Sequence, residues 1–271
     1  MPTDELMTIA RSVALAAGSL AARRRAEGVE IAASKSSPED VVTHADRETE
    51  ELIRSMLAEA RPSDGFFGEE SGADVGSSGL TWVVDPIDGT VNYLYGIPHY
   101  AVSIAAVEGE PDPSTWRALA GAVVNPANDE VFTATSGGGA FLGNRRLQVT
   151  EAELSLALVA TGFSYSADQR REQARILTGL ISQVRDIRRM GTASLDLCAV
   201  ACGRANAYFE KGLSPWDHAA GALIASEAGA RVTGLGGAPA NKNFLLAAPP
   251  LLAERLETTL ANLYTREEKL A

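Results

Sequence analysis

Between residues 80 and 149 the chain carries a close series of strand-like segments, and this block most restricts the folds open to it. Apolar and β-branched residues fill 82–84, 99–107, 117–124, 130–135 and 140–149, separated by stretches with glycine, proline and asparagine. Strands joined by few residues pair in antiparallel fashion, because a parallel pair needs a crossover of about a dozen residues or more. The sequence therefore predicts a mostly antiparallel sheet here.

The flanking regions follow the helical period instead. Apolar residues recur at helical spacing over 6–21, and the pattern is helical again over 43–60. Beyond residue 151, strands near 156–161, 186–189, 206–209 and 244–248 alternate with helices at 168–182, 193–202, 216–228 and 250–263. Such alternation is typical of α/β folds. We expect one domain over 1–271 in two halves, about 1–150 (α+β, with antiparallel sheet) and about 151–271 (α/β).

Charge and cysteine content exclude several classes of function. The chain has 24 Lys and Arg against 35 Asp and Glu, a net charge of −11, which argues against nucleic acid or an anionic membrane as a partner. Cys198 and Cys202, four residues apart on a predicted helix, fit core positions and a reducing compartment. No apolar run reaches the roughly 18 to 20 residues that span a bilayer. We expect a cytoplasmic protein without a membrane segment.

Two carboxylates lie three residues apart in the run WVVDPIDGTVNY at 82–93. An apolar strand brings Asp85 to its carboxyl end, and Pro86 is expected to end that strand so that a tight turn returns Asp88 beside Asp85. Two such carboxylates are costly unless a cation lies between them, and hard divalent cations prefer oxygen ligands. The carbonyl of Ile87 could add a neutral ligand. The alternative is that both aspartates only cap a turn.

Further features of the sequence strengthen the hypothesis of a metal site when taken together. Gly89 and Thr90 follow the aspartates where a helix is expected to begin, so their N–H groups suit a phosphate. Glu69 follows two phenylalanines, Asp217 opens an Ala/Gly-rich helix, and Asp46 lies near the start of another helix. Each acid also has a simpler explanation: a solvated charge pair for Glu69, an N-cap for Asp217 and a first-turn acid for Asp46.

The sequence DPIDGTVNY at 85–93, together with WDHAAG at 216–221, resembles the two signatures of the inositol monophosphatase family, within the lithium-sensitive sugar phosphatases. Further matches are GEES at 68–71, KSSP at 35–38 with VT at 42–43, and GTASLDL at 191–197. Their order and spacing agree from about residue 5 to 265. The resemblance implies a layered αβαβα sandwich, a homodimer, inhibition by lithium and hydrolysis of small phosphate monoesters, foremost inositol 1-phosphate.

The resemblance also implies a role for individual residues. Two or three Mg²⁺ ions would be bound, and a metal-activated water would attack phosphorus directly, without a phosphoenzyme. Thr90 and Asp46 would orient and deprotonate that water, Glu69 would hold the same metal, and Lys35 would approach on its loop. The metal ligands implied are Glu69, Asp85, the carbonyl of Ile87, Asp88 and Asp217, and the substrate contacts are Asp88, Gly89, Thr90, Ala193, Glu210 and Asp217.

Several alternatives stay open at this point. On related scaffolds the substrate could be histidinol phosphate, fructose 1,6-bisphosphate or 3′-phosphoadenosine 5′-phosphate. The last two need extra cations, for which Arg188 and Arg189 are the candidates, although a strand edge or dimer surface suits them better. Glu210 could be a solvated acid, and the segment 110–116 reads as a surface loop. A protein that keeps the fold as an interaction scaffold is the non-enzymatic alternative.

Overall fold

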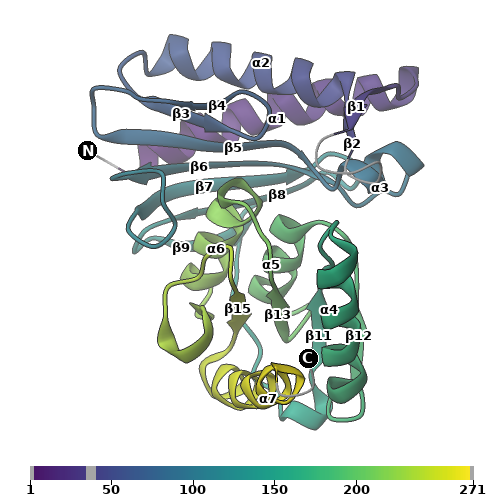
Figure 1. The fold of residues 1–271 in the computed structure, drawn as a ribbon. Coiled ribbons are helices and arrows are strands. Elements are labelled where there is room, and N and C mark those ends of the chain that lie inside the picture. The colour runs from purple at the N-terminus through teal and green to yellow at the C-terminus, as the bar shows by residue number, and fades with distance from the viewer. Residues whose placement is uncertain (1–2, 35–40, 269–271) are drawn as a thin grey trace.

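The computed structural model describes residues 3–34 and 41–268, which form five alternating layers of helix and sheet (Figure 1). The outer helices α1 (Thr3–Glu27) and α2 (His44–Ala60) cover one face of a large sheet. Helices α5 (Ala193–Ala201) and α6 (Pro215–Glu227) lie between that sheet and a smaller one. The last layer holds α4 (Ala167–Leu180) and α7 (Pro250–Glu268). The predicted αβαβα sandwich is confirmed.

The large sheet has eight strands in the order β10-β9-β8-β7-β6-β5-β3-β4. Its pairings are antiparallel except that β3 runs parallel to β5, so the predicted antiparallel block is confirmed. The predicted strand over 140–149 is wrong beyond its first residues, because a turn at 143–144 splits it into two short strands. The strands are β3 (Gly65–Gly68), β4 (Gly72–Asp74), β5 (Leu80–Asp88), β6 (Ala101–Glu108), β7 (Arg117–Asn125), β8 (Glu130–Thr135), β9 (Gly139–Leu142) and β10 (Arg145–Arg146).

The smaller sheet has five strands in the order β12-β11-β13-β15-β14. Its first three strands run parallel, as strands joined through helices do, and β15 is antiparallel to both of its neighbours. Its strands are β11 (Leu158–Thr161), β12 (Asp186–Arg188), β13 (Ala207–Glu210), β14 (Arg231–Thr233) and β15 (Leu245–Ala248). The remaining elements are β1 (Ile31–Ser34), β2 (Val41–Thr43), α3 (Thr90–Tyr95), and the 3₁₀ turns η1 (Leu154–Leu156) and η2 (Leu235–Gly237).

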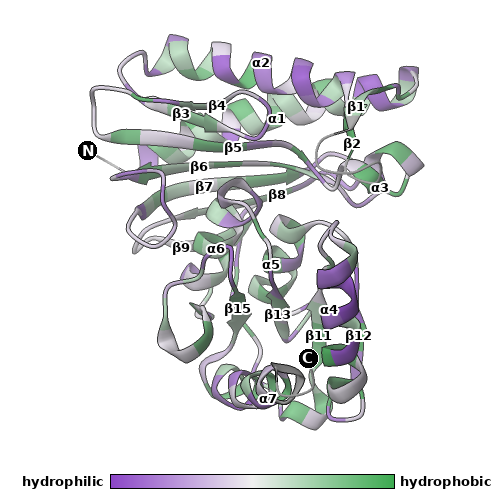
Figure 2. Cartoon of the chain, in the orientation of Figure 1, coloured by the Kyte–Doolittle hydropathy of each residue, from purple (hydrophilic) through white to green (hydrophobic). Residues whose placement is uncertain are grey.

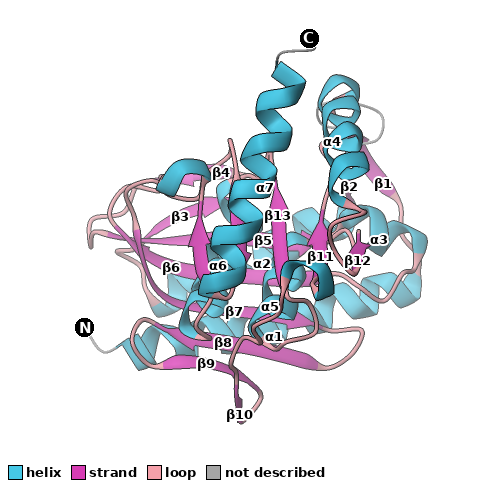
Figure 3. Ribbon diagram, turned by 90° about the horizontal axis from the view of Figure 1, so that it is seen from below, coloured by secondary structure: helices cyan, strands magenta, loops and turns pink. Residues whose placement is uncertain are grey.

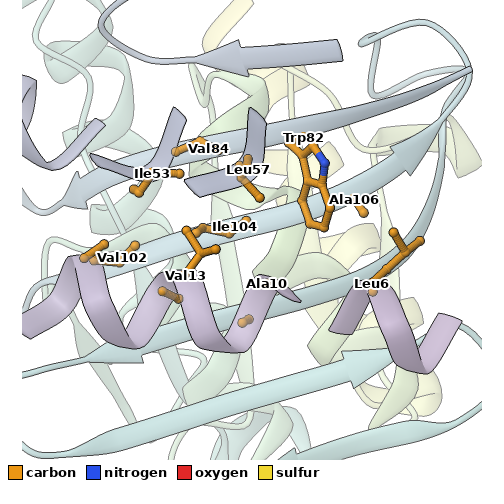
Figure 4. Close-up of a cluster of buried hydrophobic side chains, with 14 of the residues drawn as sticks. Leu6, Ala10, Val13, Ile53, Leu57, Trp82, Val84, Val102, Ile104 and Ala106 are labelled. Carbon is orange, nitrogen blue, oxygen red and sulfur yellow. The ribbon is translucent and has the colours of Figure 1, made fainter. Parts of the chain in front are cut away.

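Strand alternation divides the core between the two faces of the large sheet. Trp82 and Val84 of β5 point toward α1 and α2, whereas Val83 points toward α5 and α6. Successive side chains of a strand point to opposite faces, so an uninterrupted apolar run is what a sheet covered on both sides requires. Figure 4 shows the first of these clusters, with Trp82 and Ile53 among its buried side chains.

Small residues let the middle helices approach the large sheet closely. A Cβ atom on Gly121 of β7 would lie 3.2 Å from the Cα and Cβ of Ala220 on α6. On the other side of α6, a Cβ on Gly221 would lie 2.9 Å from Leu197 of α5. Figure 1 shows α5 and α6 between the strands of the two sheets, and Figure 3 views the molecule from the side of α7. Close packing here fixes α6 relative to β7 and α5.

Helix α1 is long and apolar enough to cross a membrane by length and composition alone. A core helix passes the same test, and α1 packs the side chains of Leu6, Ala10 and Val13 into the first core cluster with none more than 3% exposed. Figure 2 shows hydrophilic residues on α4, in the opposite outer layer. The hydropathy of α1 therefore matches its place over the sheet.

Candidate active site

The carboxyl end of β5 is bent by a β-bulge between Asp85 and Asp88. Asp85 pairs with Ser103 and Asp88 with Ala101, so three steps on β5 oppose two steps on β6. The prediction that Pro86 ends the strand is wrong, because the bulge accommodates a residue that cannot donate to the ladder. The N–H of Ile87 instead donates to Asp85 Oδ1 at 3.1 Å. The bulge therefore brings both aspartates to the same strand end, as expected.

Helix α3 begins directly after the bulge, at Thr90, with Gly89 as its N-cap. Gly89 has φ +92°, and a Cβ atom there would lie 2.4 Å from Thr192 Oγ1, so both conformation and space require glycine. Asp88 is 8% exposed, and its Oδ2 accepts the N–H of Ser194 at 2.7 Å. The start of α5 is thereby fixed to the end of β5.

Asp46 lies at the first turn of α2 and faces Thr90. Its Oδ2 accepts the backbone N–H of Thr43 at 2.7 Å, and Thr43 Oγ1 accepts the N–H of Asp46 at 3.3 Å, which together make a capping box. The Thr43 hydroxyl also lies 2.5 Å from Asp46 Oδ2. Thr90 Oγ1 lies 3.2 Å from Asp46 Oδ1 and 3.2 Å from the carbonyl of Ile87. Asp46 therefore serves as the expected first-turn acid and also contacts the threonine of the 85–93 run.

Glu69 reaches the same edge from the neighbouring strand. Because β3 and β5 are parallel, their carboxyl ends meet, and the N–H of Glu69 donates to the carbonyl of Val84 at 3.2 Å. Asp217 arrives from α6, where Ser214 is the N-cap and Asp217 Oδ2 accepts its N–H at 2.6 Å. The predicted alternative of Asp217 as N-cap is wrong by three residues, since proline follows Ser214 at the first helical position.

Burial and mutual repulsion raise the pKa values of these acids. Burial first, and then the charges of Glu69 and Glu70, raise the pKa of Asp46 to about 7, although its hydrogen bonds to Thr43 lower it. Burial, with a contribution from Glu69, raises the pKa of Asp88 to about 6. Burial and neighbouring carboxylates raise the pKa values of Asp85 and Asp217. The cluster is a concentration of negative charge that favours a cation.

The donor set suits Mg²⁺ by its chemistry. It consists of carboxylates and the Ile87 carbonyl, and hard cations such as Mg²⁺ take oxygen ligands. Among residues 3–34 and 41–268, no three acidic, histidine or cysteine side chains already converge on one point. Local backbone N–H groups hold one oxygen each of Asp85, Asp88 and Asp217. Mg²⁺ commonly keeps several waters and takes only one or two carboxylates, so a closed protein cage is not required.

A second acidic group lies beside the cluster, at the end of β13. Glu210 Oε2 accepts the hydroxyl of Tyr208 at 2.7 Å, and burial raises the pKa of Glu210 to about 7. The predicted alternative of a solvated acid is therefore wrong. Ala193, at the start of α5, is 8% exposed. Its backbone and that of Ser194 donate toward Asp88, so one helix start links Ala193 to the cluster.

A family model described as the inositol monophosphatase family matches residues 3–268. The chain belongs to this family. Its relatives include the protein named inositol-1-monophosphatase SuhB of Mycobacterium tuberculosis, 48% identical over 246 residues and covering 84% of this chain and 83% of that protein. The protein named Nus factor SuhB of Xylella fastidiosa is 44% identical over 204 residues, covering 74% and 71%. A solved structure of the extragenic suppressor protein SuhB of Bartonella henselae has a TM-score of 0.85 at 36% identity, covering 94% and 98%.

Family membership makes this chain a phosphoric monoester hydrolase of the inositol phosphate type. Enzymes of this kind act on small phosphate compounds with the help of metal ions, and the oxygen cluster at the end of β5 is where such chemistry fits. The residues implied by the family resemblance lie on helices α2, α3, α5 and α6, on strands β5 and β13, and directly after each of β3 and β5. Lys35 lies outside the described residues.

Sequence reasoning missed two residues that hydrogen-bond to the segments carrying the acidic cluster, Glu50 and Tyr208. Glu50 of α2, 3% exposed, accepts two backbone N–H groups next to Glu69. The spacing of Asp46, Glu50, Ile53 and Leu57 places Glu50 on the buried face of α2, and this was the available signal. Tyr208, which donates to Glu210, carried no signal in the sequence, because a buried aromatic residue in a strand is ordinary.

The remaining predictions concern the surroundings of the site. His218, next to Asp217, is 2% exposed, and its Nε2 has no hydrogen-bond partner within the described chain. Its ring lies 6.1 Å from that of Trp116, at the end of the 110–116 loop. Arg188 lies on the edge strand β12 and pairs with Asp186 at 2.6 Å, as predicted for a strand edge. Cys198 is buried in the core, as expected.

Proposed function

We propose that this protein is a Mg²⁺-dependent phosphatase whose preferred substrate is inositol 1-phosphate. The observation that carries the proposal is that Asp85 and Asp88 at the end of β5 meet Asp217 of α6, with Asp46 of α2 facing Thr90 beside them. Burial and neighbouring charges raise the pKa values of all four acids. A phosphate dianion would be repelled by such a cluster unless cations neutralise it. The name inositol-1-monophosphatase, borne by a relative 48% identical, supports the choice of substrate.

Two or three Mg²⁺ ions would be held by Glu69, Asp85, the Ile87 carbonyl, Asp88 and Asp217. Bound there, they would supply the positive charge that admits the phosphate and polarises the reacting oxygens. The N–H groups of Gly89 and Thr90 would hold phosphate oxygens at the start of α3. The chain's own groups then have to place the attacking water and take up its proton.

The proton would move toward Asp46. Thr90 Oγ1 lies between Asp46 Oδ1 and the carbonyl of Ile87, at 3.2 Å from each, so its hydroxyl can donate to one acceptor while accepting from water. The water oxygen forms the new bond to phosphorus as its proton passes to Asp46, and the ester oxygen leaves with the electrons of the broken bond. An acid with a pKa of about 7 suits this work near neutral pH.

Substrate recognition would use the start of α5 and the end of β13. Glu210, held by the Tyr208 hydroxyl, would accept hydrogen bonds from substrate hydroxyls, and Ala193 would leave room for the ring. A site that hydrogen-bonds a substrate hydroxyl rejects an analogue lacking it strongly. Glu210 therefore favours a polyol phosphate over a monoester without hydroxyls.

Phosphate release from purified protein tests this function. The substrates compared are inositol 1-phosphate, histidinol phosphate, fructose 1,6-bisphosphate and 3′-phosphoadenosine 5′-phosphate, with EDTA as control. We expect kcat/KM to favour inositol 1-phosphate by about tenfold or more, which is about 1.4 kcal/mol of transition-state discrimination. A preference for another compound would replace the substrate while keeping the site. LiCl at fixed Mg²⁺ should lower turnover, and an unchanged rate would show that lithium does not inhibit this enzyme.

The non-enzymatic alternative is a protein that keeps this fold as an interaction scaffold, and the name Nus factor of the Xylella relative favours it. The same assay decides between enzyme and scaffold. Metal-dependent phosphate release from any of the four compounds supports the enzyme, and its absence from all four supports the scaffold. We further propose that the chain acts as one domain and as a homodimer in the cytoplasm, where Cys198 and Cys202 stay reduced. Light scattering in solution should give twice the 28.5 kDa of the chain.

A further inference from the structure

Glu50 is a buried acid to which the proposed chemistry assigns no role. It lies on α2 one turn after Asp46, with 3% of its surface exposed. Its Oε2 accepts the backbone N–H of Glu70 at 2.8 Å, and its Oε1 accepts that of Ser71 at 2.8 Å. Hydrogen bonds to a carboxylate are stronger than those between neutral groups. Helix α2 is therefore fastened to the turn between β3 and β4 through both oxygens of one side chain.

The turn is shaped to receive this carboxylate. A Cβ atom on Gly68 would lie 2.5 Å from Glu50 Oε2 and 2.7 Å from its carboxyl carbon, so the absence of a side chain at Gly68 leaves room for Glu50. Gly72, on the far side of the turn, has φ +77°, a conformation that glycine adopts freely. Both glycines flank the two N–H groups that Glu50 binds.

The residue held in this way is Glu69, which directly precedes the two bound N–H groups. On its other side, its own N–H donates to the carbonyl of Val84 at 3.2 Å, next to Asp85. Glu69 is thus fixed by β5 from one direction and by Glu50 from the other. Its charge in turn contributes to the raised pKa values of Asp46, Asp85 and Asp88.

We infer that Glu50 is a positioning residue that sets the place of Glu69, and thereby the affinity of the cluster for Mg²⁺. This inference rests on the proposed function. Because Asp46 and Glu50 lie four residues apart on one face of α2, the same helix aligns the acid that faces Thr90 and the turn that carries Glu69. Groups that orient metal ligands without touching the metal typically change metal affinity by about 10 to 100-fold when mutated.

The test is Glu50→Gln, which keeps the shape of the side chain but turns one acceptor into a donor facing a backbone N–H. Glu227→Gln is the matched control, because the Glu227 carboxylate also accepts two backbone N–H groups, from Gly137 at 2.7 Å and Gly139 at 2.8 Å, in the β8–β9 hairpin. Mg²⁺ binding without substrate is measured by calorimetry and by the rise of the melting temperature with MgCl₂. We expect Glu50→Gln to raise the Mg²⁺ dissociation constant about tenfold and Glu227→Gln to leave it within twofold.

A folded Glu50→Gln protein with the affinity of the unmodified chain would overturn the inference, as would an equal loss in Glu227→Gln. If Glu50→Gln does not fold, Glu50→Asp decides in its place, since it keeps the charge but withdraws the carboxylate by one methylene; an unchanged affinity there refutes the inference and a tenfold loss supports it. Absence of Mg²⁺ binding in the unmodified chain would instead refute the proposed function, and this inference with it.

Discussion

Replacing Asp88 by asparagine should stabilise the metal-free protein while removing its response to Mg²⁺. Burial, with the charge of Glu69, raises the pKa of Asp88 from 3.8 to about 6 in the folded chain. Above pH 6 Asp88 is therefore ionised in the folded state at a cost in folding free energy. Two pH units correspond to about 3 kcal/mol. Asparagine removes this cost and can still accept the N–H of Ser194, now donated to Asp88 at 2.7 Å.

The sign of the pH dependence follows from linkage. Between pH 3.8 and about 6 the folded state holds more protons on Asp88 than the unfolded state does, so stability falls as pH rises through this window. The full cost of about 3 kcal/mol applies at pH 8 and roughly half of it at pH 5. With about 2 °C per kcal/mol for a chain of this size, Asp88→Asn should melt about 6 °C higher at pH 8 and about 3 °C higher at pH 5.

Differential scanning calorimetry in EDTA measures both differences. Asp112→Asn is the control, because the pKa of Asp112 is lowered by hydrogen bonds from the Ser114 N–H and hydroxyl, so losing this charge should not stabilise the chain. In MgCl₂ the unmodified protein should gain stability, whereas Asp88→Asn should gain much less. A lower melting temperature of Asp88→Asn at pH 8, or a gain that does not shrink at pH 5, would show that ionised Asp88 does not destabilise the metal-free fold.

Three further predictions follow from the same geometry. Thr90→Val should lower kcat by about 100-fold or more while calorimetry finds Mg²⁺ binding unchanged, since only the hydroxyl facing Asp46 is lost; normal turnover would exclude Thr90 from the proton path. Glu210→Gln should lower kcat/KM for inositol 1-phosphate by about 10 to 100-fold, but not that for p-nitrophenyl phosphate, in parallel assays; an equal effect on both would deny it a role in recognition. Gly121→Val should cost about 1 to 3 kcal/mol in urea unfolding, because a Cβ already meets Ala220 at 3.2 Å; unchanged stability would mean that α6 shifts freely.

Local signals in the sequence predicted most of the helices and much of the site. The helix over 43–60 carries its own apolar period and cap, so its prediction needed no knowledge of the rest of the chain, and α2 begins at His44 after Thr43. The run at 82–93 likewise predicted that Asp85 and Asp88 lie at the same strand end, because only two residues separate them. These features depend on neighbours in sequence.

What the sequence did not predict depends on partners far along the chain. Strands β3 and β4 are only 4 and 3 residues long, and β3 is defined by its parallel pairing with β5 across a gap of more than ten residues. The bulge that contains Pro86 is defined by pairing with β6, where two steps oppose three on β5. Helical spacing places Glu50 on the buried face of α2, but only the folded chain shows that it binds the N–H groups of Glu70 and Ser71. Pairings of this kind need the folded chain.

In the proposed function, the acids at the end of β5 form a Mg²⁺ site on which phosphate release depends. The most direct measurement is phosphate release from inositol 1-phosphate as MgCl₂ is increased, for the unmodified chain and for Asp88→Asn of demonstrated fold. We expect no release in EDTA, saturable activation by Mg²⁺ in the unmodified chain, and a loss of at least about 100-fold in Asp88→Asn at every Mg²⁺ concentration. Release that persists in EDTA, or full activity of Asp88→Asn, would contradict the proposed function.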